Sequence, residues 1–135
     1  MMPACVVDAD VVIAALDDHD SSHRVATRAL TKLFEQGTAL LLSLVNYTEA
    51  LVHPAGDPVA FSTATNAIGT LGLELVAPTA HMSRDAAQFR SGGVSLPDAF
   101  ALATARARDA GIATLDRRVR RAAREAGIEL APGLR

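Results

Sequence analysis

Two aspartates follow apolar segments, at places where a carboxylate is able to do chemistry. Asp8 comes directly after the apolar residues 5–7, and Asp116 directly after the segment 112–115. In an open parallel sheet, ligands bind beyond the carboxyl ends of the strands, so an aspartate there is held at the ligand edge. The alternative for each is a purely structural role as the cap of the helix that follows.

Two further carboxylates are predicted to lie on helices. Asp98 follows Pro97 in the first turn of its helix and shares a face with apolar residues such as Leu102. Its alternative role is a favourable interaction with the helix dipole, worth ~0.3–1 kcal/mol. Glu49 has apolar helical neighbours such as Val45, and burial on that side would disfavour its charge unless it has a partner. Its alternative is an exposed surface position.

These four carboxylates together predict a metal site. Brought within ~5 Å of one another, they would repel by ~3 kcal/mol per pair at an effective dielectric constant of about 20. The only lysine, Lys32, is not positioned by the sequence to neutralise them. A divalent cation would do so, and all-oxygen ligation suits Mg²⁺ or Mn²⁺. No serine or cysteine stands beside a histidine base as a competing nucleophile.

The elements that must position these residues alternate between short apolar and amphipathic segments, which predicts an α/β fold built from βαβ units. Predicted strands cover residues 4–7, 39–42, 73–76 and 112–115, with 128–130 as a candidate fifth edge strand. Predicted helices cover 10–16, 22–36, 44–53, 58–70, 80–90, 97–110 and 117–126, and Gly111 is expected to end the sixth of them. Ser21 or Ser22 is expected to cap the second helix.

Length and composition predict one domain over residues 1–135. Half of the residues are hydrophobic, and a chain of this size buries roughly two-thirds of its unfolded surface. A net charge of −2 argues against a protein that coats nucleic acid through overall positive charge. Cys5 is the single cysteine, so we expect a buried thiol in a reducing compartment. The chain has no apolar segment of ~18 residues and no basic leader, so we expect a cytoplasmic protein without membrane contact.

The ordered set of motifs resembles a PIN domain of the VapC toxin type, over nearly the whole chain. The segments that carry the resemblance are 6–16, 44–51, 96–105 and 112–119. The resemblance implies a three-layer αβα fold with a central, mainly parallel sheet of four or five strands. It maps the family's acidic quartet onto Asp8, Glu49, Asp98 and Asp116, and the family's Thr-x-Asp motif onto Thr114 and Asp116.

Asp10 departs from the pattern, because many relatives carry Ser, Thr or Asn at this place. It either adds a water-mediated contact to the metal or caps the next helix, and we favour the cap.

The resemblance also implies an activity and partners. It implies a metal-dependent endoribonuclease that cleaves RNA with a metal-activated water, without a covalent enzyme intermediate, and leaves a 5′-phosphate on one product. Toxins of this type pair with a cognate antitoxin and with a second copy of themselves, so we expect both partners.

The last helix carries a basic face made of Arg117, Arg120, Arg121 and Arg124. Because this face begins beside Asp116, it is a candidate for holding the RNA backbone that flanks the cut. The alternative is a solvated surface with ordinary helix ion pairs.

An apolar stripe on the predicted helix 58–70 has two interpretations. Its residues are Val59, Ala60, Ala64, Ala67, Ile68 and Leu71. Core packing is the default, and a homodimer or antitoxin surface is the alternative.

Two other functions fit parts of the sequence. Asp8 and Asp10 match the Asp-x-Asp motif of haloacid-dehalogenase-like phosphatases, in which Asp8 would be the nucleophile. That family also needs a later lysine, and Lys32 comes too early. A degenerate PIN domain that acts only through protein binding would usually have lost part of the quartet, whereas all four positions here are acidic.

Overall fold

A parallel sheet of four strands forms the centre of the computed structural model, which describes residues 2–134. Its strands are β1 (Ala4–Val7), β2 (Ala39–Ser43), β3 (Glu74–Val76) and β4 (Gly111–Ala113), in the order β3-β2-β1-β4. All neighbouring strands are parallel. In the central strand β1, Val6 is paired with Leu41 of β2 on one side and with Ile112 of β4 on the other. The prediction of a mainly parallel sheet is confirmed.

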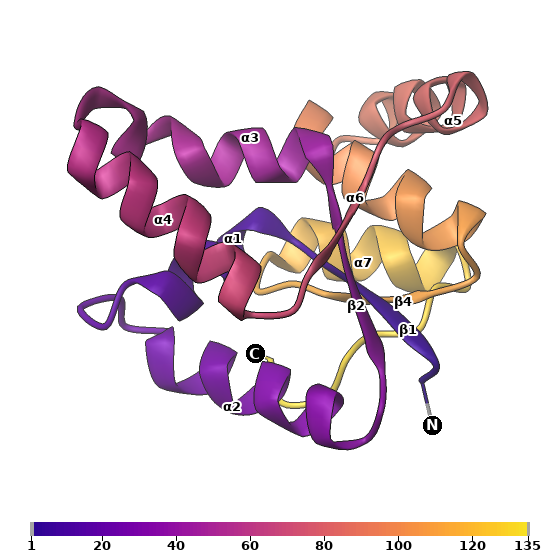
Figure 1. The fold of residues 1–135 in the computed structure, drawn as a ribbon. Helices are drawn as coiled ribbons and strands as arrows, with labels where there is room; N and C mark the ends of the chain where they lie inside the picture. The colour runs from indigo at the N-terminus through magenta and orange to yellow at the C-terminus, as the bar shows by residue number, and fades with distance from the viewer. Residues whose placement is uncertain (1, 135) are drawn as a thin grey trace.

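Strand order reverses at β1. The chain moves outward from β1 through β2 to β3, and then returns to place β4 on the other side of β1. Such a reversal opens a crevice beyond the carboxyl ends of the two strands at which the order turns. The residues that follow β1 and β4 therefore lie at the edge where open α/β sheets bind ligands (Figure 1).

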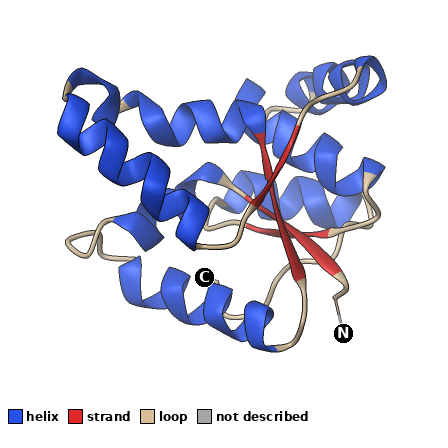
Figure 2. Ribbon diagram, in the orientation of Figure 1, coloured by secondary structure: helices blue, strands red, loops and turns tan. Residues whose placement is uncertain are grey.

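Helices cover both faces of the sheet and give three layers, as expected (Figure 2). One layer consists of α1 (Ala9–Leu16), α2 (His23–Glu35), α3 (Leu44–Val52) and α4 (Pro58–Thr70). The short 3₁₀ helix η1 (Pro54–Gly56) connects α3 to α4. The other consists of α5 (Ala80–Ser91), α6 (Leu96–Ala107) and α7 (Arg117–Glu125). None of the helices within residues 2–134 has the length and apolar character needed to cross a bilayer.

The strands are apolar on both sides because each face packs against helices. In β1, Cys5 and Val7 pack into the core under α1 and α2, while Val6 packs into the core under α6 and α7. Strands buried on both faces show continuous hydrophobic runs rather than alternation, which is the pattern read from the sequence.

Small side chains are buried on more than one side of helix α6, which packs against α5 as well as the sheet. Ala99, Ala101, Ala103 and Ala105 are completely buried, and α6 contacts both β1 and β4. Side chains of this size let the helix backbone approach its neighbours closely. The first turn of α6, which carries Asp98, thereby reaches the carboxyl edge of the sheet.

The fourth strand and the C-terminal segment differ from the prediction. β4 ends at Ala113, so Thr114 lies in the loop that leads to α7 rather than in a strand. Within residues 2–134, the predicted strand 128–130 is reduced to one parallel bridge between Ile112 and Leu130. This segment still covers the outer edge of β4, because the N–H of Ile112 donates to the carbonyl of Glu129 over 2.9 Å.

The predicted role of Gly111 as a helix terminator is wrong. Helix α6 ends at Ala107, and the residue with left-handed backbone in the following turn is Asp109, with φ of 51°. Gly111 instead begins β4, where a Cβ atom would lie 2.9 Å from the carbonyl oxygen of Glu129. Glycine is needed there for close approach of the C-terminal segment, not for a turn.

Candidate functional site

Asp8 lies at the carboxyl end of β1 and is 1% exposed. Its Oδ1 accepts a hydrogen bond from the N–H of Ala9 (2.9 Å), which makes it the cap of α1, and its Oδ2 accepts one from the hydroxyl of Thr114 (2.8 Å). Burial raises the pKa of Asp8 well above its usual range, and the charges of Asp10 and Asp98 raise it further. Asp8 therefore caps α1 and also interacts electrostatically with Asp10 and Asp98.

Asp10 does not cap α1, so the cap that we favoured from the sequence is wrong. Its Oδ2 instead accepts a hydrogen bond from the N–H of Leu115 (3.1 Å), which ties α1 to the loop after β4. Its Oδ1 is buried and has no hydrogen-bond partner within residues 2–134. Burial raises the pKa of Asp10 to about 6, and the charges of Asp98 and Asp116 act in the same direction.

Asp116 caps α7 at the same edge. Its Oδ1 accepts hydrogen bonds from the N–H groups of Arg118 (2.7 Å) and Val119 (3.2 Å). Its own N–H donates to the hydroxyl oxygen of Thr114 (3.1 Å), the hydroxyl that donates to Asp8. Thr114 therefore links the loop after β4 to the end of β1.

Asp98 and Glu49 approach from the helices. Asp98 lies in the first turn of α6, which is capped by the hydroxyl of Ser95 (3.3 Å to the Asp98 N–H). Burial raises the pKa of Asp98, and the charge of Asp116 adds to this rise. Burial also raises the pKa of Glu49, with the charge of Asp98 as the next cause. Both side chains are half-buried.

The four predicted carboxylates and a fifth, Asp10, lie near enough for each to interact electrostatically with at least one other. The five side chains are Asp8, Asp10, Glu49, Asp98 and Asp116. The four with raised pKa values lie in an environment that disfavours negative charge. A bound divalent cation would offset the negative charge of these carboxylates.

The chemistry of the carboxylate side chains fits a hard divalent cation, although their arrangement is not yet that of a complete metal site. No three His, Cys, Asp or Glu side chains within residues 2–134 already share metal-binding geometry. Both oxygens of Asp8 and one of Asp10 are engaged with protein donors. The buried Oδ1 of Asp10, by contrast, is an acceptor without a donor, and the set consists of oxygen ligands alone, which suits Mg²⁺ or Mn²⁺.

Asn46 is a residue of this region that the sequence did not single out. It lies on α3, is completely buried, and donates a hydrogen bond from Nδ2 to the carbonyl of Pro97 (3.1 Å). The available signal was its position one turn before Glu49 on the same helix. A buried asparagine needs a partner, but the sequence does not identify that partner on another helix.

The basic face of α7 lies beside the carboxylates, next to a hollow of about 550 Å³. Arg117, Arg121 and Arg124 are exposed, whereas Arg120 is half-buried and donates to the carbonyl of Leu134 (2.6 Å). Part of the predicted RNA-binding face is therefore used inside the protein.

An apolar groove of about 510 Å³ lies next to Glu49. It runs between α1, α3 and α4, and its walls include Ile13, Ala64 and Ala67, with Glu49 and His53 also on its lining. Of the α4 stripe, only Ile68 is buried, and Val59 is 74% exposed. The expectation of core packing holds for Ile68, and Ala64 also packs partly against the core. Three alanines of the stripe, Ala60, Ala64 and Ala67, line the groove.

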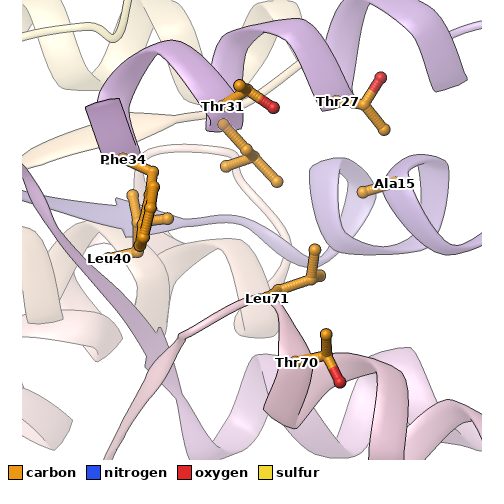
Figure 3. A pocket seen from close by; sticks show the side chains of 8 residues that line it. Ala15, Thr27, Thr31, Phe34, Leu40, Thr70 and Leu71 are labelled. Atoms are coloured by element: carbon orange, nitrogen blue, oxygen red, sulfur yellow. The ribbon is translucent and has the colours of Figure 1, made fainter. Parts of the chain in front are cut away.

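A smaller hollow lies away from the carboxylates. It has a volume of about 250 Å³ between α1, α2 and the end of α4, and Figure 3 shows Phe34, Leu40 and Leu71 on its walls. Its lining has apolar side chains and threonines but no charged residue, so it lacks the groups that the chemistry of the acidic site requires.

The PIN domain profile matches residues 5–125 of this chain. This match argues against the phosphatase alternative. No curated protein sequence matches the chain significantly.

Several solved structures have similar folds. Rickettsia felis VapBC2, bound to a DNA fragment from its promoter, has a TM-score of 0.72 at 14% identity, over 94% of this chain and 96% of that one. Neisseria gonorrhoeae FitAcB has a TM-score of 0.70 at 18% identity, over 93% and 95%. Mycobacterium tuberculosis VapC20, a toxin that cleaves the sarcin-ricin loop, has a TM-score of 0.64 at 16% identity, over 80% and 86%. At these identities the likeness concerns the fold.

Proposed function

We propose that this chain, which belongs to the PIN domain family, is a metal-dependent endoribonuclease that acts as the toxin of a toxin–antitoxin pair. The observation that carries the proposal is the gathering of five carboxylates at the carboxyl edge of the sheet. Burial and mutual repulsion raise the pKa values of four of them, which is a typical environment of functional sites. The similar fold of a toxin that cleaves RNA supports the same conclusion.

We infer that Asp8, Glu49, Asp98 and Asp116 hold Mg²⁺ or Mn²⁺. When bound, the cation supplies Lewis acidity, activating a water molecule and neutralising charge on the scissile phosphate. Thr114 keeps Asp8 oriented through its hydroxyl, and the buried Oδ1 of Asp10 is available to accept a hydrogen bond from a water of the site or to bind the cation itself. We assign Asp10 and Thr114 to support of the quartet.

The reaction needs no protein nucleophile. The oxygen of one water molecule forms a bond to phosphorus and the bond from phosphorus to the 3′-oxygen breaks. The attacking water loses one proton and the leaving 3′-oxygen gains one from solvent, so the products carry a 3′-hydroxyl and a 5′-phosphate. The acidic cluster would repel RNA by itself. The exposed guanidinium groups of Arg117, Arg121 and Arg124, beside Asp116, offset that repulsion by binding backbone phosphates.

The partners follow from the same family relation. Similar folds come from VapBC and FitAcB assemblies, which supports a cognate antitoxin as the partner of this chain. The apolar groove between α1, α3 and α4 is the surface we assign to that partner, because apolar side chains such as Ile13, 40% exposed, are left uncovered beside Glu49. A homodimer is proposed on the family relation alone.

The test is incubation of the purified chain with total cellular RNA in Mg²⁺ or Mn²⁺, followed by sequencing of the new ends. We expect cuts at a limited set of sites, with 5′-phosphate and 3′-hydroxyl ends, and no cuts in EDTA. Absence of cleavage in both metals would favour a domain that acts only through protein binding, and cleavage that persists in EDTA would contradict the metal mechanism.

A further inference from the structure

Asn46 joins the two helices that carry the helical carboxylates of the site. It lies on α3 one turn before Glu49, and its Nδ2 donates over 3.1 Å to the carbonyl of Pro97, the residue before Asp98 on α6. The two ends of this hydrogen bond are 51 residues apart in sequence. Each end is therefore within one helical turn of a carboxylate of the site.

The orientation of the Asn46 amide is fixed by its partner. The Pro97 carbonyl is only an acceptor, so Nδ2 must face it, and a flipped amide would place two acceptors together. Oδ1 consequently points away from Pro97, and it is buried without a hydrogen-bond partner within residues 2–134. The Asn46 amide thus donates a hydrogen bond to the start of α6, and its own oxygen accepts none within residues 2–134.

The same side chain acts on Glu49. The Asn46 amide opposes the rise in the pKa of Glu49 that burial and Asp98 cause, because it favours the charged carboxylate. Asn46 therefore contacts the first turn of α6 through Pro97 and favours the charged form of Glu49 on α3.

We propose that Asn46 is a positioning residue, which sets the separation and orientation of Glu49 and Asp98 by tying α3 to the first turn of α6. The inference rests on the proposed function, because it assumes that these carboxylates hold a divalent cation. Metal affinity depends on such outer contacts, whose loss typically weakens binding by about 10- to 100-fold.

A purely structural role for Asn46 predicts a different result. The Pro97 carbonyl also faces the N–H of residue 101 in the regular helical pattern, so loss of the Asn46 donor does not orphan it. Replacing an amide that already leaves a buried acceptor unpaired with an apolar side chain of similar volume has little effect on stability or increases it. A structural residue would then change neither metal affinity nor the mobility of the α6 start.

The test compares Asn46→Leu with Thr38→Val in the full chain. Thr38 is a matched control because it is also buried, at 5% exposure, and donates one long-range hydrogen bond to a backbone carbonyl, that of Met2, over 2.7 Å. Two quantities are measured on the folded proteins: the Mn²⁺ dissociation constant by titration calorimetry, and amide hydrogen exchange at Ala99 and Ala101 in EDTA.

We expect Asn46→Leu to weaken Mn²⁺ binding at least about tenfold and to speed exchange in the first turns of α6, with Thr38→Val unchanged in both. Mn²⁺ affinity within twofold of wild type would overturn the inference. If Asn46→Leu does not fold, Asn46→Ser, whose shorter side chain cannot reach Pro97, is judged by the same criteria. Failure of the wild-type chain to bind Mn²⁺ would instead refute the proposed function.

Discussion

The hydroxyl of Thr114 donates a hydrogen bond to Oδ2 of Asp8 over 2.8 Å, across 106 residues of sequence. The hydroxyl oxygen of Thr114 in turn accepts a hydrogen bond from the N–H of Asp116 over 3.1 Å. One small side chain thus connects the residues that follow β1 and β4, the two strands at which the sheet order reverses. The bond also favours the charged form of Asp8, against the effect of its burial on the pKa.

Thr114→Val should therefore weaken Mn²⁺ binding about tenfold while the chain stays folded, because valine has nearly the same volume but cannot donate. Thr104→Val is the matched control: Thr104 is 1% exposed, and its hydroxyl donates within α6 to the carbonyl of Phe100 over 2.7 Å. Titration calorimetry checks both variants. Equal Mn²⁺ affinity of Thr114→Val and wild type would remove Thr114 from the site.

Asp98→Asn should reduce RNA cleavage on the order of 10²–10³-fold, the usual loss when one electrostatic group is removed from a reacting centre. The fold should persist, since the amide removes charge from a crowded cluster. Asp109→Asn makes the same chemical change at an exposed loop residue and should cleave like wild type. Initial cleavage rates and thermal melts provide the comparison. Undiminished cleavage by Asp98→Asn would exclude its carboxylate from the mechanism.

The metal-free chain should be more stable at pH 5 than at pH 7.5. Asp10 has a pKa raised by burial to about 6, whereas an unfolded aspartate titrates near ~4, so the folded state binds more protons between these values. Stability then falls as pH rises through this window, and Asp8, Glu49 and Asp98 shift in the same direction.

Thermal melts in EDTA and in Mn²⁺ measure this dependence. Mn²⁺ should raise the melting temperature at pH 7.5 far more than at pH 5, because the cation binds the deprotonated carboxylates of the folded state. Asp8→Asn should show a weaker pH dependence and a smaller gain from Mn²⁺. A metal-free chain that is more stable at pH 7.5 would contradict the raised pKa values.

Arg117→Gln with Arg121→Gln should weaken RNA binding and lower the slope of log affinity against log salt by about two, roughly one for each lost phosphate contact. The matched control is Arg24→Gln with Arg28→Gln, a second exposed pair with the same helical spacing on α2. Binding is measured in an Asp98→Asn background to prevent cleavage. Equal salt slopes for the two double variants would assign the RNA contact elsewhere.

Much of the fold was readable from local signals. Ser43, Asp57 and Thr79 each accept a hydrogen bond from the N–H of a following helical residue, as their types and positions indicate, whereas Ser22 precedes α2 without a side-chain capping bond. Apolar runs located the strands because both faces of the sheet are buried. The predicted edge strand 128–130 is reduced to a single bridge, which is held by backbone hydrogen bonds between Ile112 and residues 129 and 131.

The site was less readable than the fold. Residue type and position after strands identified Asp8 and Asp116, because a parallel sheet brings its carboxyl ends to one edge. The role of Asp10 depends on a contact with the N–H of Leu115, and the role of Asn46 on a contact with the carbonyl of Pro97. Such long-range backbone partners leave no local pattern in a sequence, so these contacts emerge only from the packed structure.

Titration of Mn²⁺ into the purified chain, followed by calorimetry at pH 7.5, tests most directly whether the five carboxylates form a cation site. We predict saturable binding to the wild-type chain that Asp8→Asn abolishes or weakens strongly and that Asp109→Asn leaves unchanged. Absence of Mn²⁺ binding to the wild-type chain, or equal Mn²⁺ binding to Asp8→Asn, would contradict the proposal that these carboxylates form a cation site.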